Sequence, residues 1–414
     1  MRSAWAWLAL LALPVYFATF SNGAALARSV DVIADADTGA YVRLLSEWSI
    51  ERRYGNAWAS PGRSIGDQSQ EHKIKHVLVP LACGPVSRWL ATLGLSPLRA
   101  AMLPFAVLGA VNLLLIGIIL SGLQVRQAVI VPLVALTAVA PYQWIYASVP
   151  ESWTLSGTMV LLTIVAVIRG APRAAVGVLV GVAMLNNVIL VALSAFAALY
   201  QLRQRSGILI AVRTAAATAI VAVSVWLLAL SVLGQYDHDL RPDRVARFLL
   251  FFPSLLEGTS LAPWDPRLLR VSLEQWLLTA FVSSQHNVRL AGWGLGETWG
   301  QSLVGQVAIV TVASLWLASG WAWYRGAKDP HVVETPGALP ALLGLGFLMW
   351  GALHLLGPIS MFLYSPALSP LVILAAGVAL NRAPRRFDRY LWLAPALVLP
   401  AAVSQIVFLE SYLR

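Results

Sequence analysis

Residues 101–121 read AMLPFAVLGAVNLLLIGIILS, twenty-one consecutive residues without a charged side chain. A helix needs about 20 residues of this kind to cross the hydrocarbon core of a bilayer. The whole chain has the same character, since 58% of its 414 residues are hydrophobic and only 12% are charged. Soluble domains carry about twice that charged fraction. The sequence therefore predicts an all-α, polytopic integral membrane protein.

Comparable apolar segments occur along the whole chain. One of them, 174–200, contains the pair Asn186-Asn187 within GVAMLNNVILVAL and is flanked by basic residues on both sides. Two short helices that meet near the outer face would explain this pattern, and one long tilted span is the alternative. We therefore expect about 10–11 transmembrane helices in a single membrane domain over 1–414. The candidate spans lie near 4–20, 101–121, 128–147, 153–168, 174–200, 208–233, 301–323, 338–356, 366–381 and 391–409.

The basic residues are concentrated in the short connections between these spans. Arg2 and the connections hold thirteen basic residues but only three acids, which accounts for the whole formal net charge of +10. By the positive-inside rule the N-terminus and these connections are cytoplasmic, whereas the long loops 21–100 and 234–300 are outside. Topology thus explains the basic balance without a nucleic-acid partner. The connections contain Arg126, Arg169, Arg173, Arg203, Arg205, Arg213, Arg325, Lys328, Arg382, Arg385, Arg386 and Arg389.

The N-terminal segment MRSAWAWLALLALPVYFATFSNGAALA has a basic start and a long apolar core. We expect an uncleaved first span, because a core of about 17 residues exceeds that of ordinary signal peptides, and a cleaved signal peptide is the alternative. Cys83 is the sole cysteine, which excludes an intramolecular disulfide. Tryptophans near the predicted span ends are expected to be interfacial anchors; they include Trp144, Trp153, Trp321, Trp350 and Trp392.

The first outer loop begins its polar part with DADTGAYVRLLSEW at 35–48. Tyr41, Leu44, Leu45 and Trp48 recur at helical spacing, which predicts an interfacial amphipathic helix over 38–50. Asp37 at its head fits an N-cap, and Asp35 then fits a solvated loop acid. A cap needs only one acid, however, and acids facing a cavity at a membrane surface are what an enzyme needs to deprotonate a hydroxyl acceptor.

A basic cluster follows in the same loop, where QEHKIKHVLVP covers 70–80 and holds His72, Lys73, Lys75 and His76. Two interpretations stay open for it, a phosphate-binding site and a solvated patch that touches anionic headgroups. The spacing of His72 and His76 can place two imidazoles on one helical face, as in zinc sites. Because no third ligand is evident, we predict no metal site, and a divalent metal ion stays open as a cofactor.

Three further polar residues are binding candidates. Glu151 follows Pro150 at the outer end of a span, where it is either functional or a helix-terminal acid that complements the dipole. Asn187 is expected to be a hinge or an interhelical hydrogen-bond partner rather than a substrate contact. Arg289 lies in SSQHNVRLAGWG of the second outer loop, which we expect to cap the cavity.

Taken together, these motifs resemble the C-type glycosyltransferases, which include the protein O-mannosyltransferases and aminoarabinose transferases. Their outer-loop motif D-E-x-x-Y is similar to Asp37-Thr38-Gly39-Ala40-Tyr41, in which Thr38 replaces the glutamate. Their K-P-P-L corresponds to Lys75 through Pro80, which keeps the cation and one proline but loses the proline pair. YASVPESWTLSGTMVLL at 146–162 resembles the family's outer-face P-E, and FLYSPALSPLVILAAG at 362–377, with Tyr364, resembles its aromatic-proline entry into a late helix.

The resemblance implies a polyprenyl-phosphate-linked sugar donor and an inverting transfer to a glycan, lipid or protein acceptor. The active site would lie at the outer face of the cell membrane, which is the inner membrane in a Gram-negative cell. Asp37 would be the catalytic base and Asp35 the second acid. The binding residues would be His72, Lys73, Lys75, His76, Glu151, Asn187, Arg289 and Tyr364. The alternatives are a lipid or small-molecule transporter or flippase, which predicts broken helices and charges placed mid-span, and a non-catalytic assembly subunit.

Overall fold

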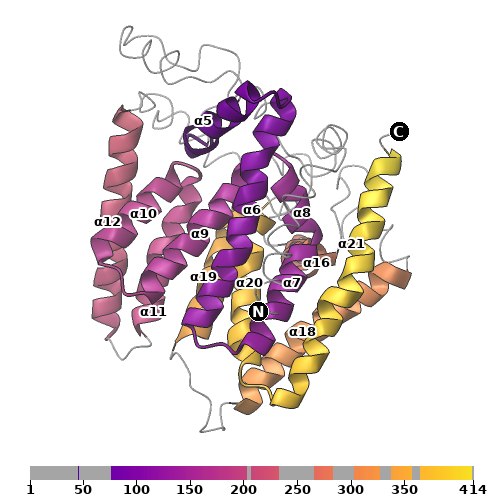
Figure 1. Cartoon of the computed structure of the whole chain (residues 1–414). Coiled ribbons are helices and arrows are strands. Elements are labelled where there is room, and N and C mark those ends of the chain that lie inside the picture. Colours follow the sequence, from indigo (N-terminus) through magenta and orange to yellow (C-terminus); the bar gives the residue numbers. More distant parts are fainter. Residues whose placement is uncertain are drawn as a thin grey trace.

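A computed structural model describes Leu45 and residues 76–202, 207–232, 265–282, 303–326, 337–356 and 364–412. Within these ranges every regular element is a helix or a helical turn (Figure 1). The all-α prediction is therefore confirmed for this part of the chain. The predicted first span 4–20 lies outside the described residues, as does the predicted helix 38–50 apart from Leu45, which is helical and fully buried.

The helices follow one another with short connections. In chain order they are α5 (Leu78–Thr92), α6 (Pro97–Gly122), α7 (Gln127–Val139), α8 (Pro141–Ser148), α9 (Ser152–Ile168), α10 (Arg173–Met184), the 3-10 turn η4 (Val188–Ala192), α11 (Leu193–Leu202), α12 (Ile208–Val232), α15 (Pro266–Glu274), the π-helical turn η5 (Gln275–Thr279), α16 (Ala280–Val282), α18 (Leu303–Gly326), α19 (Ala338–Leu356), α20 (Ser365–Leu380), the 3-10 helix η6 (Arg385–Trp392) and α21 (Leu393–Tyr412).

Four of these helices are long and apolar enough to cross a membrane, namely α6, α12, α18 and α19. The segment predicted near 128–147 is a fifth candidate, but it is bent by 57° between α7 and α8. Pro141 explains the bend, because its ring fixes φ and removes the N–H that α7 would need to continue. The described part thus supports four or five crossings, and the total of ten to eleven stays a prediction.

The interruption predicted at Asn186-Asn187 is confirmed, since α10 ends at Met184 and the chain resumes as η4 and α11. Gly177 lies against Thr218 and Val221, and Gly181 lies against Ala222 and Val225, so α10 and α12 run in the same direction. Only five residues separate the end of α11 at Leu202 from the start of α12 at Ile208. The segments α10 and α11 therefore form a hairpin beside α12 (Figure 1), and each is too short to cross a bilayer alone.

The basic connections that the structure describes gather at one end of the bundle, where α6, α9, α18 and α20 all end. Gly122 lies near Ile168, Arg126 bonds to Asn381, and Gly326 packs on Arg382. We call this the arginine end. The N-termini of α9 and α20 meet at the opposite end, where Gly157 packs closely on the backbone of Pro366. We call this the α9 end. Its assignment to the outer side of the membrane stays a prediction.

Candidate functional site at the α9 end

The start of α9 is set by the three residues before it. Val149 is extended, at φ −125° and ψ 130°, as expected for a residue that precedes a proline. Pro150 cannot continue α8, so the chain reaches Glu151 in an extended conformation, at φ −144° and ψ 140°. The Oε1 atom of Glu151 then accepts hydrogen bonds from the backbone N–H of Ser152 at 2.7 Å and from its hydroxyl at 2.9 Å. Glu151 thus caps α9.

Glu151 is 4% exposed, which is unusual for a carboxyl group. The positive end of the α9 dipole and the two hydrogen bonds from Ser152 offset part of the cost of burying this side chain. Both interpretations of Glu151 therefore stay open. The side chain caps α9, as a helix-terminal acid should, and its burial at a helix end is also compatible with a functional role.

Asn186 fastens the tip of the hairpin to the first turn of α9. Its side-chain N–H2 donates to the backbone oxygen of Ser152 at 2.8 Å and to the hydroxyl of Ser156 at 2.6 Å. Asn186 is fully buried. Its neighbour Asn187 caps η4 instead, with Oδ1 accepting from the N–H of Ile189 at 3.2 Å. The interhelical role that the sequence predicted for Asn187 is therefore filled by Asn186.

His76 joins the same group of residues from the N-terminal side of α5. Its Nδ1 bonds to the backbone oxygen of Asn186, and the N–H of Leu78 bonds to the oxygen of Leu185 at 3.3 Å. A carbonyl oxygen only accepts, so Nδ1 of His76 carries the proton in this contact. This contact places the last residue of the predicted basic cluster within one hydrogen-bonded chain that runs through Asn186 and Ser152 to Glu151.

Tyr364 enters from the N-terminus of α20. Its ring lies edge-on to that of Trp153, with 4.6 Å between the ring centroids. The close approach of Gly157 to Pro366 holds these helix ends together. Ser148 ends α8 and Ser365 begins α20. The hydroxyls of both residues are buried and make no hydrogen bond with the described residues.

A polar seam continues from this end toward the middle of the bundle. The hydroxyl of Thr154 donates to the oxygen of Tyr146 at 2.7 Å, and the hydroxyl of Thr158 donates to Asn112 at 2.7 Å. Asn112 in turn donates to the oxygen of Thr154 at 3.3 Å, which ties α6 to α9. Sequence reasoning missed Asn112, although an isolated asparagine within a long apolar helix is the signal that finds such contacts, and it identified Asn186 only as part of the helix break.

The predicted binding residues therefore fall into two groups. His76, Glu151 and Tyr364 gather around the first turn of α9, with Asn187 next to the residue that joins them. Asp35, Asp37, His72, Lys73, Lys75 and Arg289 lie outside the described residues. Two of the predicted interfacial anchors were wrong. Trp144 is 2% exposed, because the bend after α7 turns α8 into the core, and Trp153 is 5% exposed at the start of α9, where it packs against Tyr364.

Leu45, the one described residue of the segment 38–50, also packs at this end. It is fully buried in a cluster with Val79, Cys83, Ala101, Phe105 and Leu155. Leu155 is the fourth residue of α9, so Leu45 packs against the bundle close to the cap formed by Glu151.

Metal and cofactor sites can be tested only among the described residues, which contain no group of three or more His, Cys, Asp or Glu side chains that could hold a metal ion. Comparison with protein-family models, with curated proteins and with solved structures found no match. Function must therefore be inferred from the chemistry of the α9 end and from the sequence motifs beside it.

Proposed function

We propose that the chain is a membrane glycosyltransferase that moves a sugar from a polyprenyl-phosphate donor to a hydroxyl acceptor at the α9 end. One observation carries the proposal, the burial of Leu45 against Leu155 and Cys83. Asp37 precedes Leu45 by eight residues, which corresponds to about 12 Å along a helix. The proposal is that the acidic motif lies close to the buried carboxyl group of Glu151 and to the partly buried His76.

The proposed chemistry needs one base and several cations. Asp37 accepts the proton of the acceptor hydroxyl while that oxygen forms a bond to the anomeric carbon from the face opposite the donor phosphate. The bond between the anomeric carbon and the phosphate oxygen breaks, and the electron pair leaves with the phosphate. Lys73, Lys75 and His76 stabilise the charge on that group. Glu151 and Tyr364 hold sugar hydroxyls by hydrogen bonding and ring stacking.

The experiment that tests this function is transfer of radiolabelled sugar from polyprenyl-phosphate donors in membranes that contain the protein. We expect Asp37→Asn to lower turnover by about 100-fold or more, with normal membrane insertion, because asparagine can still cap a helix but cannot accept the proton. Asp35→Asn makes the same change in loop charge and tests the second acid. Near wild-type transfer by both variants would refute the glycosyltransferase assignment.

A transporter is the second candidate, and two interruptions in the helices favour it. The 57° bend between α7 and α8 and the break between α10 and η4 both lie in chain segments that flank α9. Irregular backbone within a membrane protein is tolerated where it is covered by protein or lines a water-filled cavity, and discontinuous helices form the substrate sites of many transporters. Movement of a fluorescent polyprenyl-phosphate lipid across vesicles, without sugar transfer, would favour this candidate.

A further inference from the structure

The 3-10 helix η6 at the arginine end has two unlike faces. Leu391 is 4% exposed and packs into the core, and Phe387 is partly buried against it. Arg385, Arg386 and Arg389 are exposed. Tyr390 and Trp392 are 47% and 49% exposed. An eight-residue helix thus presents three cations and two amphipathic aromatic side chains on the outside of the protein.

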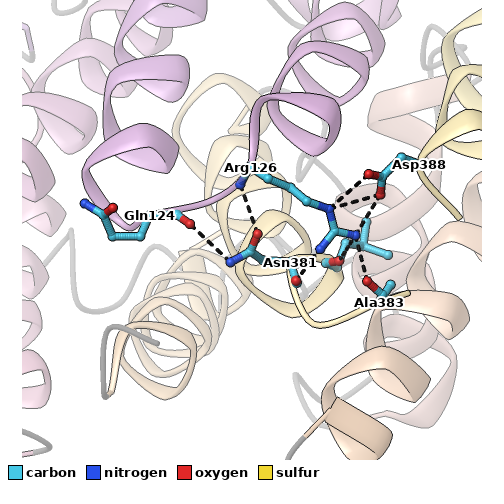
Figure 2. Close-up of polar contacts among 6 residues, drawn as sticks. Gln124, Arg126, Asn381, Ala383 and Asp388 are labelled. Atoms are coloured by element: carbon cyan, nitrogen blue, oxygen red, sulfur yellow. Dashed lines mark hydrogen bonds and ion pairs between the residues drawn. The ribbon is translucent and has the colours of Figure 1, made fainter. Parts of the chain in front are cut away.

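The helix η6 is held firmly in this position by Arg126 (Figure 2). The Nη2 of Arg126 lies 2.7 Å from Oδ1 of Asp388, and its Nε bonds to both carboxylate oxygens at 3.0 and 3.1 Å. The same guanidinium donates to backbone oxygens at the end of α20, those of Leu380 at 3.2 Å, Ala383 at 2.8 Å and Asn381. One arginine thus fixes η6 and the end of α20 relative to each other.

These contacts of Arg126, which we call the clamp, also determine the net charge on the exposed face of η6. Asp388 is the one acid in η6, and its carboxylate is already paired with Arg126. The three exposed arginines therefore have no acid of their own helix to neutralise them. Arg389 is further ordered by Tyr390, since its guanidinium lies 4.7 Å from the ring centroid and donates to the tyrosine hydroxyl at 2.7 Å.

We propose that η6 is a binding surface for the headgroups of anionic phospholipids in the surrounding bilayer. The guanidinium groups of Arg385, Arg386 and Arg389 bind the headgroup phosphates, which accept paired N–H donors. Tyr390 and Trp392 lie at the level of the headgroups, where such rings are enriched in membrane proteins. The adjoining exposed apolar residues of α21, Leu393 and Leu397, continue into the acyl region. A preordered cationic helix at the foot of a lipid-facing helix fits this partner.

The test uses the full chain purified in neutral detergent and titrated with phosphatidylglycerol, with bound lipid counted by native mass spectrometry. Each arginine near an anionic surface contributes about fivefold in affinity, so Arg385→Gln with Arg386→Gln should weaken binding by about 25-fold. Phosphatidylcholine should bind weakly to the wild type and to the variant. The thermal midpoint should not change, because both side chains are exposed.

The matched control is Arg169→Gln with Arg173→Gln, which removes the same charge from two exposed residues in the connection between α9 and α10. This pair should lower phosphatidylglycerol affinity by less than about threefold, and Arg389→Gln alone should lower it by about fivefold. Equal losses in the η6 pair and the control pair would show that only net charge matters and would overturn the proposal. Equal affinity for phosphatidylcholine, or unchanged binding in the η6 pair, would overturn it as well.

Discussion

The arginine end and the α9 end are both polar clusters in an otherwise apolar bundle, but they differ in how completely their groups are paired. At the arginine end Arg126 donates to Asp388 and to three backbone oxygens, and Asn381 accepts from the N–H of Arg126 at 2.9 Å and donates to Gln124 at 3.2 Å. At the α9 end, by contrast, the buried hydroxyls of Ser148 and Ser365 have no hydrogen bond with the described residues.

The difference indicates separate roles for the two ends. A closed network of charge-assisted hydrogen bonds stabilises the fold, since each such bond contributes about 1.5–3 kcal/mol. A buried hydroxyl without a partner costs about 1–3 kcal/mol. Proteins retain such groups where a ligand or water completes their bonding. The arginine end is therefore interpreted as a structural clamp, and the α9 end as the place where a substrate would complete the pairing.

The largest effect on stability is expected from breaking the clamp. Arg126→Ala removes the partner of a carboxylate whose side chain is only 18% exposed and leaves the end of α20 without its donor. We expect a loss of about 2–4 kcal/mol in the free energy of unfolding, measured as denaturant unfolding in detergent micelles. An unchanged unfolding curve would show that the clamp is not structural.

The packing that brings Tyr364 to Trp153 is tested next. A Cβ at Gly157 would lie 2.9 Å from the carbonyl carbon of Pro366, so Gly157→Ala forces α9 and α20 apart. We expect a loss of about 1–3 kcal/mol. Gly320→Ala in α18 is the control, because a Cβ there meets nothing within 4 Å and alanine is the better helix former. Equal effects of the two changes would contradict the close contact.

A smaller effect of opposite sign is expected from the unpaired hydroxyls. Ser148→Ala removes a buried oxygen that has no hydrogen bond with the described residues, so stability should stay the same or rise by up to about 1 kcal/mol. Asn381→Ala at the arginine end should instead cost about 1 kcal/mol. Thermal midpoints of the two variants, measured side by side, check the contrast. A loss of stability in Ser148→Ala as large as that in Asn381→Ala would contradict the expected difference between the two ends.

The sides of the membrane can be assigned to the two ends by cysteine labelling, which changes no contact in the core. Burial raises the pKa of the Cys83 thiol to about 12, so the wild-type chain should react little with a maleimide at neutral pH. We expect Ser60→Cys to be labelled from outside and Arg385→Cys only after the cell is permeabilised. Labelling of both from the same side would show that the predicted topology is wrong.

Much of this arrangement could be predicted from composition and single residues. The break at Asn186-Asn187 followed from two basic loops that one crossing cannot join, and Glu151 stood out as an acid among apolar residues. The contact of Asn186 with Ser152, by contrast, depends on a hairpin that no local pattern specifies. Trp144 and Trp153 were misplaced because the burial of Trp144 depends on the bend at Pro141 and that of Trp153 on its tertiary contact with Tyr364. In the sequence, Arg126 and Asp388 served only to assign the sides of the membrane, and the ion pair between them is visible only in the structure.

The central claim, that one end acts and the other stabilises, is tested most directly by a crossed pair of variants. Glu151→Gln keeps a side-chain oxygen that can cap α9, and Asp388→Asn keeps one that can accept from Arg126. Each substitution therefore removes a negative charge and leaves the size of the side chain nearly unchanged. Sugar transfer per folded molecule and the free energy of unfolding are measured for both. We predict that Glu151→Gln loses about 10–100-fold in transfer with wild-type stability, whereas Asp388→Asn loses about 1–3 kcal/mol of stability with wild-type transfer. The reverse pattern, or the same pattern in both variants, would contradict the claim.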